Sequence, residues 1–160
     1  MEVVLFCPEI PPNTGSIARL CAAAGVRLNL IEPLGFSLED RYLKRAGLDY
    51  WPQVELKVWP GWEEFTARKK GTGRLVMTSA RSGLAHHRHL YRDTDLLVFG
   101  PETKGLPPEL AAGAETMLRI PILGDVRSIN LANAVAVVLY EGLRQTGVLD
   151  SDPEANRDGA

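Results

Sequence analysis

Short, uninterrupted apolar runs alternate with helical patterns along almost the whole of this 160-residue chain, and no other feature constrains its fold as strongly. The runs contain too few polar residues to be half-exposed strands, so we expect them to be buried on both faces, as strands of a parallel sheet are. The alternation therefore predicts an α/β fold with a mostly parallel sheet flanked by helices. The expected strands span residues 2–7, 28–32, 54–59, 74–78, 95–99 and 116–120.

The segments between these strands carry helix start and stop signals. We expect the first helix over residues 14–25, with Asn13 or Thr14 as its cap and Gly25 at its end. A second helix is expected over residues 37–47, where a serine is followed three positions later by an aspartate, the pattern of a capping box. Further helices are expected over residues 62–71, 107–113 and 130–147.

Length and composition indicate one soluble domain. Residues 1–149 are expected to form that domain, and the polar residues 150–160 a disordered tail. No apolar run reaches the length of a membrane span and the N-terminus reads as a strand, so we expect a cytoplasmic protein. Two cysteines, Cys7 and Cys21, are too few for a disulfide framework and are interpreted as free thiols.

The net charge of −2 argues against a protein that coats nucleic acid nonspecifically, but basic residues cluster in three segments. The clusters are Arg41, Lys44 and Arg45; Arg68, Lys69 and Lys70; and Arg81, Arg88 and Arg92. Each could contact RNA or form an ordinary solvated surface, and the charge pattern alone leaves both open. The three histidines at positions 86, 87 and 89 lack accompanying carboxylates or cysteines, so no metal site is predicted.

Three loops rich in polar, glycine and proline residues follow expected strands: PEIPPNTG, GPETKGLPP and PILGDVRSIN. Ligands of parallel sheets bind at the carboxyl ends of strands, so these loops predict a site. In the second loop Gly100 and Gly105 allow a ligand to approach the backbone, while Pro101 and Pro107 stiffen it. The loop matches neither a P-loop nor a dinucleotide fingerprint, and a tight turn without a ligand is the alternative.

The third loop offers polar groups beside a helix start. Ser128 or Asn130 is expected to cap the last helix, and with Arg127 these side chains also place hydrogen-bonding groups next to an apolar core. On the first helix, Arg19 is either a surface side chain or a group turned toward the loops. No serine occupies a nucleophile elbow, so a Ser-His-Asp triad is not supported.

NTGSIARLCAAAG, FGPETKGLP and RIPILGDVRSINLANAVAVVLYE together resemble the three ordered motifs of the SPOUT class of RNA methyltransferases. PEIPPNTG, IEPLGF and RAGLDYW resemble more narrowly the family that methylates the ribose 2′-oxygen of the tRNA wobble cytidine or uridine. The resemblance covers residues 3–147. It implies a C-terminal deep trefoil knot whose loops bind S-adenosylmethionine, and a homodimer with the two knots packed together. Knots are too rare for composition to predict one.

The resemblance also implies residue roles. It assigns cofactor contacts to Thr78, Gly100, Ile120 and Ser128. The family more often has leucine at the position of Thr78, so we expect that residue to contact the cofactor through its main chain. Main-chain groups of the second and third loops suit an adenine edge, which needs both donors and acceptors.

The catalytic residues implied by the resemblance are Arg19, Ser128 and Asn130. A guanidinium in a protein stays protonated and is a poor proton acceptor, so we expect Arg19 to hold a phosphate or to stabilise oxyanion charge. Asn13, Ser128 and Asn130 are interpreted as hydrogen-bonding organisers. Glu102 is interpreted as positioning either the polar end of the cofactor or Arg19.

The resulting hypothesis is methyl transfer from S-adenosylmethionine to the 2′-hydroxyl of the wobble pyrimidine in the tRNA anticodon loop, with no metal. The same reaction on another RNA, such as rRNA, and a noncatalytic RNA-binding or nucleotide-binding knotted domain are the alternatives. Tyr140 is assigned equally to dimer packing and to catalysis. Without room for an added RNA-binding domain, the dimer itself must recognise the tRNA, and the candidate contacts are Arg41, Arg45, Arg81 and Arg88.

Overall fold

The computed structural model describes residues 1–38, 51–112 and 114–151. In this part of the chain a seven-stranded sheet has the order β3-β2-β1-β6-β4-β7-β5, and all its strand pairs are parallel. The strands are β1 (Glu2–Phe6), β2 (Arg27–Ile31), β3 (Leu56–Trp59), β4 (Leu75–Thr78), β5 (Leu84–Ala85), β6 (Leu96–Phe99) and β7 (Thr116–Arg119). The predicted α/β fold with a parallel sheet is confirmed.

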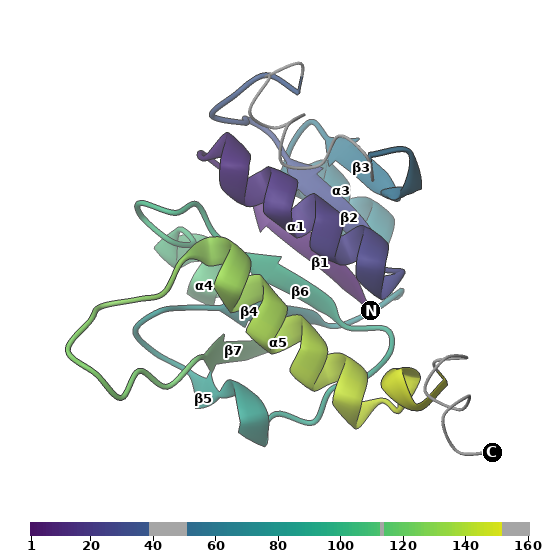
Figure 1. The fold of residues 1–160 in the computed structure, drawn as a ribbon. Helices are drawn as coiled ribbons and strands as arrows, with labels where there is room; N and C mark the ends of the chain where they lie inside the picture. The colour runs from purple at the N-terminus through teal and green to yellow at the C-terminus, as the bar shows by residue number, and fades with distance from the viewer. Residues whose placement is uncertain (39–50, 113, 152–160) are drawn as a thin grey trace.

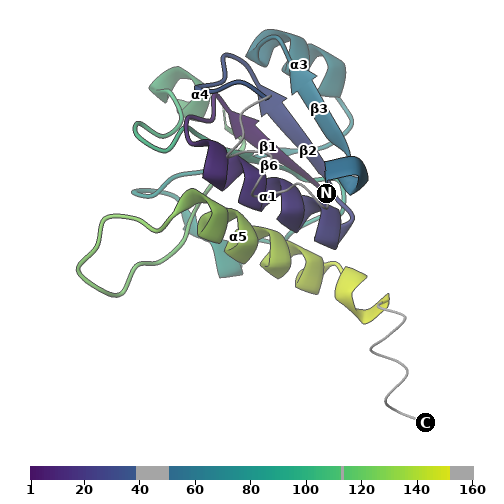
Figure 2. The same ribbon diagram turned by 45° about the horizontal axis from the view of Figure 1, so that its top comes forward.

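Helices cover both faces of this sheet. On one face α1 (Pro11–Ala24) and α5 (Leu131–Gln145) lie side by side, as the two views agree (Figure 1) (Figure 2). The other face is covered by α3 (Trp62–Lys69), and the short α4 (Pro108–Ala112) follows β6. These helices correspond to the predicted segments, and α5 is the longest of the described helices, as expected.

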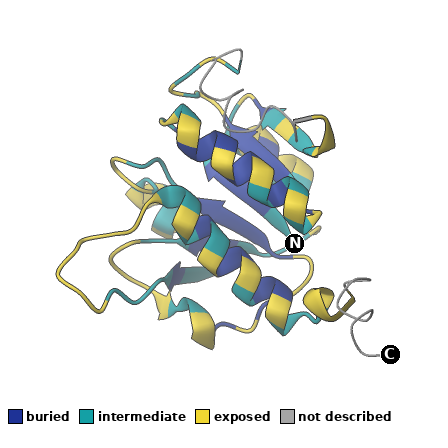
Figure 3. Ribbon diagram, in the orientation of Figure 1, coloured by how far each residue is buried: buried dark blue, intermediate teal, exposed yellow. Residues whose placement is uncertain are grey.

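The two cores follow from the alternation of side chains along a strand. Val3 and Leu5 of β1 pack in one cluster with Leu139 of α5, while Val4 points to the opposite face and packs in a cluster with Phe65 of α3. Figure 3 shows the strands buried and the outer sides of the helices exposed. β1 is thus buried on both faces, which explains its unbroken apolar run.

The start of α1 corrects the sequence prediction. The helix begins at Pro11 rather than at residue 14, its N-cap is Ile10, and neither Asn13 nor Thr14 caps it. Pro11 and Pro12 occupy the first helical positions and have no N–H group. The start of α1 therefore has two fewer main-chain N–H donors that need a capping side chain. The predicted end is confirmed, because Gly25 adopts the left-handed conformation with φ 63°.

The two-residue strand β5 is absent from the sequence prediction. It pairs with β7 on the side away from β4, although residues 79–83 connect β4 directly to β5. The chain therefore crosses β7 in this short connection. At Gly83, where φ is 119°, a Cβ atom would lie 2.5 Å from the carbonyl oxygen of Met117, so only glycine fits the crossing. The threading of the later chain through a trefoil knot stays a prediction.

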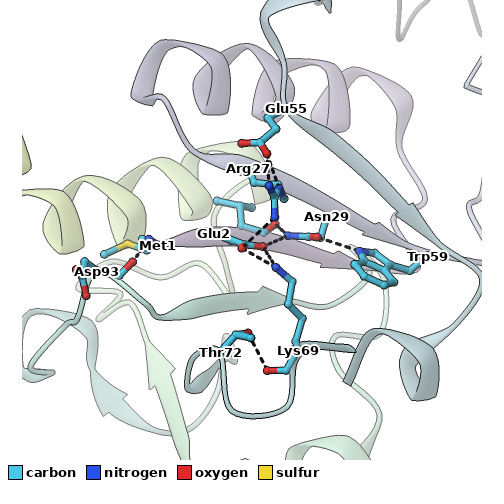
Figure 4. A network of polar contacts seen from close by, with 10 residues as sticks. Met1, Glu2, Arg27, Asn29, Glu55, Trp59, Lys69, Thr72 and Asp93 are labelled. Carbon is cyan, nitrogen blue, oxygen red and sulfur yellow. Dashed lines mark hydrogen bonds and ion pairs between the residues drawn. The ribbon is translucent and has the colours of Figure 1, made fainter. Parts of the chain in front are cut away.

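A polar network lies at the amino-terminal ends of the strands (Figure 4). Glu2 accepts hydrogen bonds from Lys69 Nζ at 2.6 and 2.7 Å and from Asn29 Nδ2 at 2.7 Å, and Arg27 Nη1 lies 3.5 Å from its carboxylate. The buried Asn29 also accepts from Trp59 Nε1 at 2.9 Å. Burial acts to raise the pKa of Glu2, but the hydrogen bonds from Lys69 and Asn29 and the two nearby cations outweigh it, so this pKa is lowered.

Some sequence predictions fall outside the described residues. These are most of the helix expected over residues 37–47, the candidate RNA contacts Arg41 and Arg45, and the tail from residue 152. Within the described ranges both cysteines are free, as expected, and burial raises the pKa of Cys21 to about 12. None of the helices in these ranges is long and apolar enough to cross a membrane.

Candidate active site

The three loops singled out in the sequence meet at the carboxyl ends of the strands, on the left in Figure 1. The first loop joins β1 to α1, the second joins β6 to α4, and the third joins β7 to α5. Because β1 and β6 are adjacent and parallel, the first two loops leave the sheet as neighbours. The third loop reaches them because α5 packs against α1.

Glu102 in the second loop binds the start of α1. Its carboxylate accepts hydrogen bonds from the main-chain N–H of Glu9 at 2.9 Å, from that of Ile10 at 3.3 Å, and from Asn13 Nδ2 at 3.0 Å. A helix N-terminus favours a negative charge because of its dipole and its unpaired N–H groups. The acidic group that stabilises the start of α1 therefore comes from a different loop.

Glu9 in the first loop makes the reciprocal contact with the second loop. Its carboxylate accepts from Thr103 N at 3.0 Å and from Thr103 Oγ1 at 2.8 and 2.9 Å. The segment that follows β2 also contacts the first loop. Gly35 N donates to Pro8 O at 2.9 Å, and a Cβ atom on Gly35 would lie 2.8 Å from Glu9 Cα. Two carboxylates thus join the first and second loops.

Asn130 joins the third loop to the same network. Its Oδ1 accepts from Ala132 N at 2.8 Å and from Asn133 N at 3.4 Å, so Asn130 rather than Ser128 caps α5. Its Nδ2 donates to Asn13 Oδ1 at 2.9 Å. Hydrogen bonds therefore run without a break from Glu102 through Asn13 to Asn130, and they connect all three loops.

The third loop presents main-chain groups that the fold does not use. Within the described part of the chain, residues 120–129 form no main-chain to main-chain hydrogen bond. Leu123 is 98% exposed and Val126 is 62% exposed, and Figure 3 shows this long loop to be largely exposed. Free N–H and C=O groups beside apolar side chains are suited to a ligand that has both donors and acceptors.

Gly100 is packed tightly against the turn that it begins. A Cβ atom on it would lie 2.3 Å from Leu106 N and 2.5 Å from the carbonyl carbon of Gly105. Gly105 has φ 71° and donates its N–H to Pro101 O at 2.9 Å, which closes the turn. Both glycines are therefore required by the shape of the second loop.

The predicted cofactor contacts Thr78 and Ile120 lie at the ends of paired strands. Thr78 ends β4, and Ile120 directly follows β7, which pairs with β4. The hydroxyl of Thr78 donates to Val98 O at 3.0 Å, so this side chain is already used within the sheet. The contact of Thr78 with a ligand through its main chain stays a prediction.

The remaining predicted residues face solvent. Arg19 lies on the exposed side of α1, six residues after the buried Asn13. Ser128 is exposed, and its hydroxyl forms no hydrogen bond within the described residues. All three residues assigned to catalysis are exposed, and of these the structure places Asn130 in the loop network.

Glu9 and Thr103 are part of the loop network but were not singled out in the sequence. A signal for Glu9 was present: the segments Phe6–Glu9 and Phe99–Glu102 share the pattern Phe-x-Pro-Glu directly after a strand. A repeat of this kind on neighbouring strands places two carboxylates at the same edge of the sheet. Thr103 carries no comparable signal, because its role depends on where the other loop lies.

Several cations lie near the two ends of the sheet, and they differ in whether they form ion pairs. At the amino-terminal ends Arg27, Lys69 and Arg74 pair with Glu2, Glu55 and Asp95. Near the carboxyl ends, Arg81, Lys104, Arg119 and Arg127 are among the cations that form no ion pair with any described residue. Unpaired positive charge beside the loops favours an anionic partner there.

Comparison with known proteins gives a family and several relatives. The family model described as the SpoU rRNA Methylase family matches residues 1–140. A curated protein of Aeromonas hydrophila, named tRNA (cytidine(34)-2'-O)-methyltransferase, is 49% identical to this chain over 153 residues, which cover 94% of this chain and 97% of that protein.

Solved structures show the same fold. One, described as giving structural insights into the 2-OH methylation of C/U34 on tRNA, matches with a TM-score of 0.87 at 46% identity and covers 90% of this chain and 94% of that chain. Another, of an AdoMet-bound rRNA methyltransferase from Sinorhizobium meliloti, matches with a TM-score of 0.81 at 27% identity. It covers 89% of this chain and 55% of that chain.

Proposed function

The chain belongs to the SpoU rRNA Methylase family, and we propose that it methylates the ribose 2′-hydroxyl of the wobble pyrimidine in the tRNA anticodon loop, with S-adenosylmethionine as methyl donor. The observation that carries the proposal is the near full-length relationship to a tRNA (cytidine(34)-2'-O)-methyltransferase. The joined loops at the carboxyl ends of the strands support it, because a site of this kind needs several loops held in one arrangement.

The residues at this edge fit S-adenosylmethionine. The donor set is the unbonded main chain of residues 120–129, which provides both N–H and C=O groups for an adenine edge. Gly100, Thr78 and Ile120 end or follow three adjacent strands and would offer main-chain groups next to it. When bound, the cofactor supplies an activated methyl group.

Arg19 would act on the RNA rather than on a proton. A guanidinium carries a positive charge and five N–H donors, which suit a phosphate or the oxyanion that develops at the 2′-oxygen. Asn130 is held by the α5 cap and by Asn13, so its role is to keep the third loop in place. The free hydroxyl of Ser128 is available for a ligand.

A tRNA partner is supported by the charge pattern. Lys104 and Arg127 belong to the loops, and Arg81 and Arg119 follow or end neighbouring strands. Each backbone phosphate that meets one of these cations adds salt-dependent affinity. Arg81 is one of the RNA contacts expected from the sequence, and it belongs to this set. A protein recognises the unstacked bases of an anticodon loop with an open surface, and not with an element that enters a groove of an RNA helix.

The test of the function is methyl transfer by the purified protein. We expect tritium from methyl-labelled S-adenosylmethionine to be incorporated into tRNA at the wobble ribose, and mapping of ribose methylation to place it there. Arg19→Ala should retain affinity for S-adenosylhomocysteine in calorimetry but lose methyl transfer. If the wild-type protein binds neither S-adenosylmethionine nor S-adenosylhomocysteine, the proposal that it is an enzyme is wrong. Methylation of rRNA alone would favour the rRNA alternative.

We also propose that the protein works as a homodimer with a knotted C-terminal part, through the α1 and α5 face. On the outer side of α5, Val137 is 39% exposed and Tyr140 is 42% exposed. Apolar groups of this size on a helix next to the loops are suited to contact with a second copy. Tyr140 is then a packing residue.

The dimer is tested by sedimentation velocity. Val137→Asp should shift the protein to the monomer, because a charge in an apolar interface is costly to bury. Arg68→Asp, on the exposed side of α3 across the sheet, is the matched control and should leave the dimer intact. If the wild-type protein sediments as a monomer at micromolar concentration, the proposed dimer is wrong. The proposed methyl transfer is not tested by that result.

A further inference from the structure

Two copies of one short pattern stand at the ends of adjacent parallel strands. Phe6–Glu9 begins with the last residue of β1 and Phe99–Glu102 with the last residue of β6, and both read Phe-x-Pro-Glu. In both, the glutamate is the third residue after the last residue of its strand. Because β1 and β6 pair directly, the two glutamates leave the sheet at the same edge and each can reach the loop of the other.

The contacts between these loops are reciprocal. The Glu102 carboxylate accepts hydrogen bonds from the main-chain N–H groups of Glu9 and Ile10. The Glu9 carboxylate accepts from the main-chain N–H and the hydroxyl of Thr103, and all these donor–acceptor distances lie between 2.8 and 3.3 Å. Neither carboxylate forms an ion pair within the described residues. Their charges are instead stabilised by N–H and O–H donors, which have fixed directions and therefore hold a geometry.

The tip of the second loop depends on these bonds. Among the described residues, the side chains and main chain of residues 102–104 hydrogen-bond only to the first loop and to Asn13. The turn below closes on itself through Gly105 N and Pro101 O. Removal of the Glu9 carboxylate would free Thr103 while leaving Glu102 bound at the start of α1. Glu9 can therefore be tested separately from Glu102.

We propose that Glu9 and Thr103 are a positioning pair for the methyl-transfer site, which holds the second loop ready for the cofactor before the cofactor binds. The inference rests on the proposed function and deepens it. Neither residue is assigned contact with the reacting atoms. The pair acts by removing the cost of ordering the loop on binding, so its loss should appear in cofactor affinity.

The experiment compares Glu9→Ala with wild type in steady-state methyl transfer and in calorimetry with S-adenosylhomocysteine. We expect the KM for S-adenosylmethionine and the Kd for S-adenosylhomocysteine to rise about tenfold, while kcat at saturating cofactor stays within about twofold. Glu32→Ala is the matched control, because Glu32 is an exposed carboxylate at the end of β2 that forms no side-chain hydrogen bond in the described residues.

Substitutions of Thr103 separate a positioning role from a general loss of stability. Thr103→Ser keeps both donors and should behave as wild type, whereas Thr103→Val keeps only the N–H and should raise KM by less than Glu9→Ala does. In the Glu9→Ala background, Thr103→Val should add nothing further, since the partner of its hydroxyl is gone. If Glu9→Ala fails to fold, Glu9→Gln, which retains one acceptor oxygen, replaces it in the same comparison.

The outcomes distinguish this inference from the proposed function. An active wild type whose Glu9 variants lower only the melting temperature, or lower kcat without a change in KM, would overturn the positioning pair and leave the reaction intact. A wild type with no methyl transfer to any RNA would overturn the proposed function itself. Additive effects of the Glu9 and Thr103 substitutions would show that the two residues do not act together.

Discussion

At the scale of single residues, two neighbours in the first turn of α1 show how much a hydrogen-bond partner matters. Asn13 is 9% exposed and is satisfied on both sides of its amide, by Glu102 and by Asn130. Thr14 is fully buried, yet its hydroxyl has no partner. A buried, unsatisfied hydroxyl loses its bonds to water and gains none in return.

Thr14→Val is therefore expected to stabilise the protein. Valine has the same shape and removes the unpaired hydroxyl, so the free energy of unfolding in urea should rise by about 1 kcal/mol. Thr66→Val is the control and should lower the free energy of unfolding, because it removes the hydrogen bond that the Thr66 hydroxyl donates to Trp62 O at 3.0 Å. A destabilised Thr14→Val would mean that the hydroxyl has a partner in solution, such as a bound water.

Gly100→Ala should damage the site more than the fold. The added Cβ meets the backbone of Gly105 and Leu106, which must shift, at a cost of roughly 1–3 kcal/mol in stability. We expect at least about a tenfold loss of affinity for S-adenosylhomocysteine in calorimetry, since the second loop changes shape. Gly61→Ala, where a Cβ meets nothing within 4 Å, should leave that affinity unchanged. Normal affinity in Gly100→Ala would exclude this part of the loop from cofactor binding.

At the scale of elements, a buried ion pair holds the amino-terminal ends of β4 and β6 together. Asp95 is completely buried and accepts from Arg74 Nε at 2.8 Å, from Arg74 Nη2 at 2.9 Å and from Arg92 N at 2.9 Å. Arg74 also donates to Leu90 O at 2.9 Å, which ties in the segment that follows β5. The pair therefore joins β4 and β6, which are neighbours in the sheet.

Arg74→Met should destabilise the protein by about 3 kcal/mol, because it leaves the buried carboxylate of Asp95 without its partner. The measurement is urea unfolding at neutral pH. Arg144→Met is the matched control: Arg144 is 65% exposed and pairs with Glu141 on the surface of α5. Surface pairs contribute at most about 1 kcal/mol, so equal losses in the two variants would contradict this account.

At the scale of the whole molecule, the two ends of the sheet have different electrostatic roles. At the amino-terminal end Arg27, Lys69 and Arg74 pair with carboxylates and contribute to stability, as the network around Glu2 does. The carboxyl end leaves cations unpaired and joins its loops through carboxylates held by N–H and O–H donors. Stability and RNA binding should therefore respond to pH and salt through different residues.

Glu2→Gln tests the stabilising end through pH. Because the folded protein lowers the pKa of Glu2 below its ordinary value of 4.5, Glu2 contributes stability that is fully present above that value and is lost as the pH falls through the lower, folded pKa. Wild type should thus exceed Glu2→Gln in unfolding free energy near pH 7, and the difference should shrink below about pH 4.5. A difference that stays constant from pH 7 to pH 3 would mean that the charge of Glu2 contributes nothing.

The sequence predicted the elements well because their signals are local. The apolar runs predicted β1 and β6, and the cap at Asn130 and the stop at Gly25 follow from the residue types at those positions. The strand β5 escaped prediction because two residues carry no periodicity. The start of α1 was misplaced because proline removes the need for a capping side chain.

By itself, the sequence determined the parallel sheet, the order of its elements and the three loops at its carboxyl ends, since each of these follows from the pattern of a few neighbouring residues. Only the tertiary structure decided which loop holds which. Glu102 reaches Glu9 and Asn13 across 93 and 89 residues, and Asn130 reaches Asn13 across 117. Hydrogen bonds over such separations depend on strand order and helix packing, which no local pattern of residues contains.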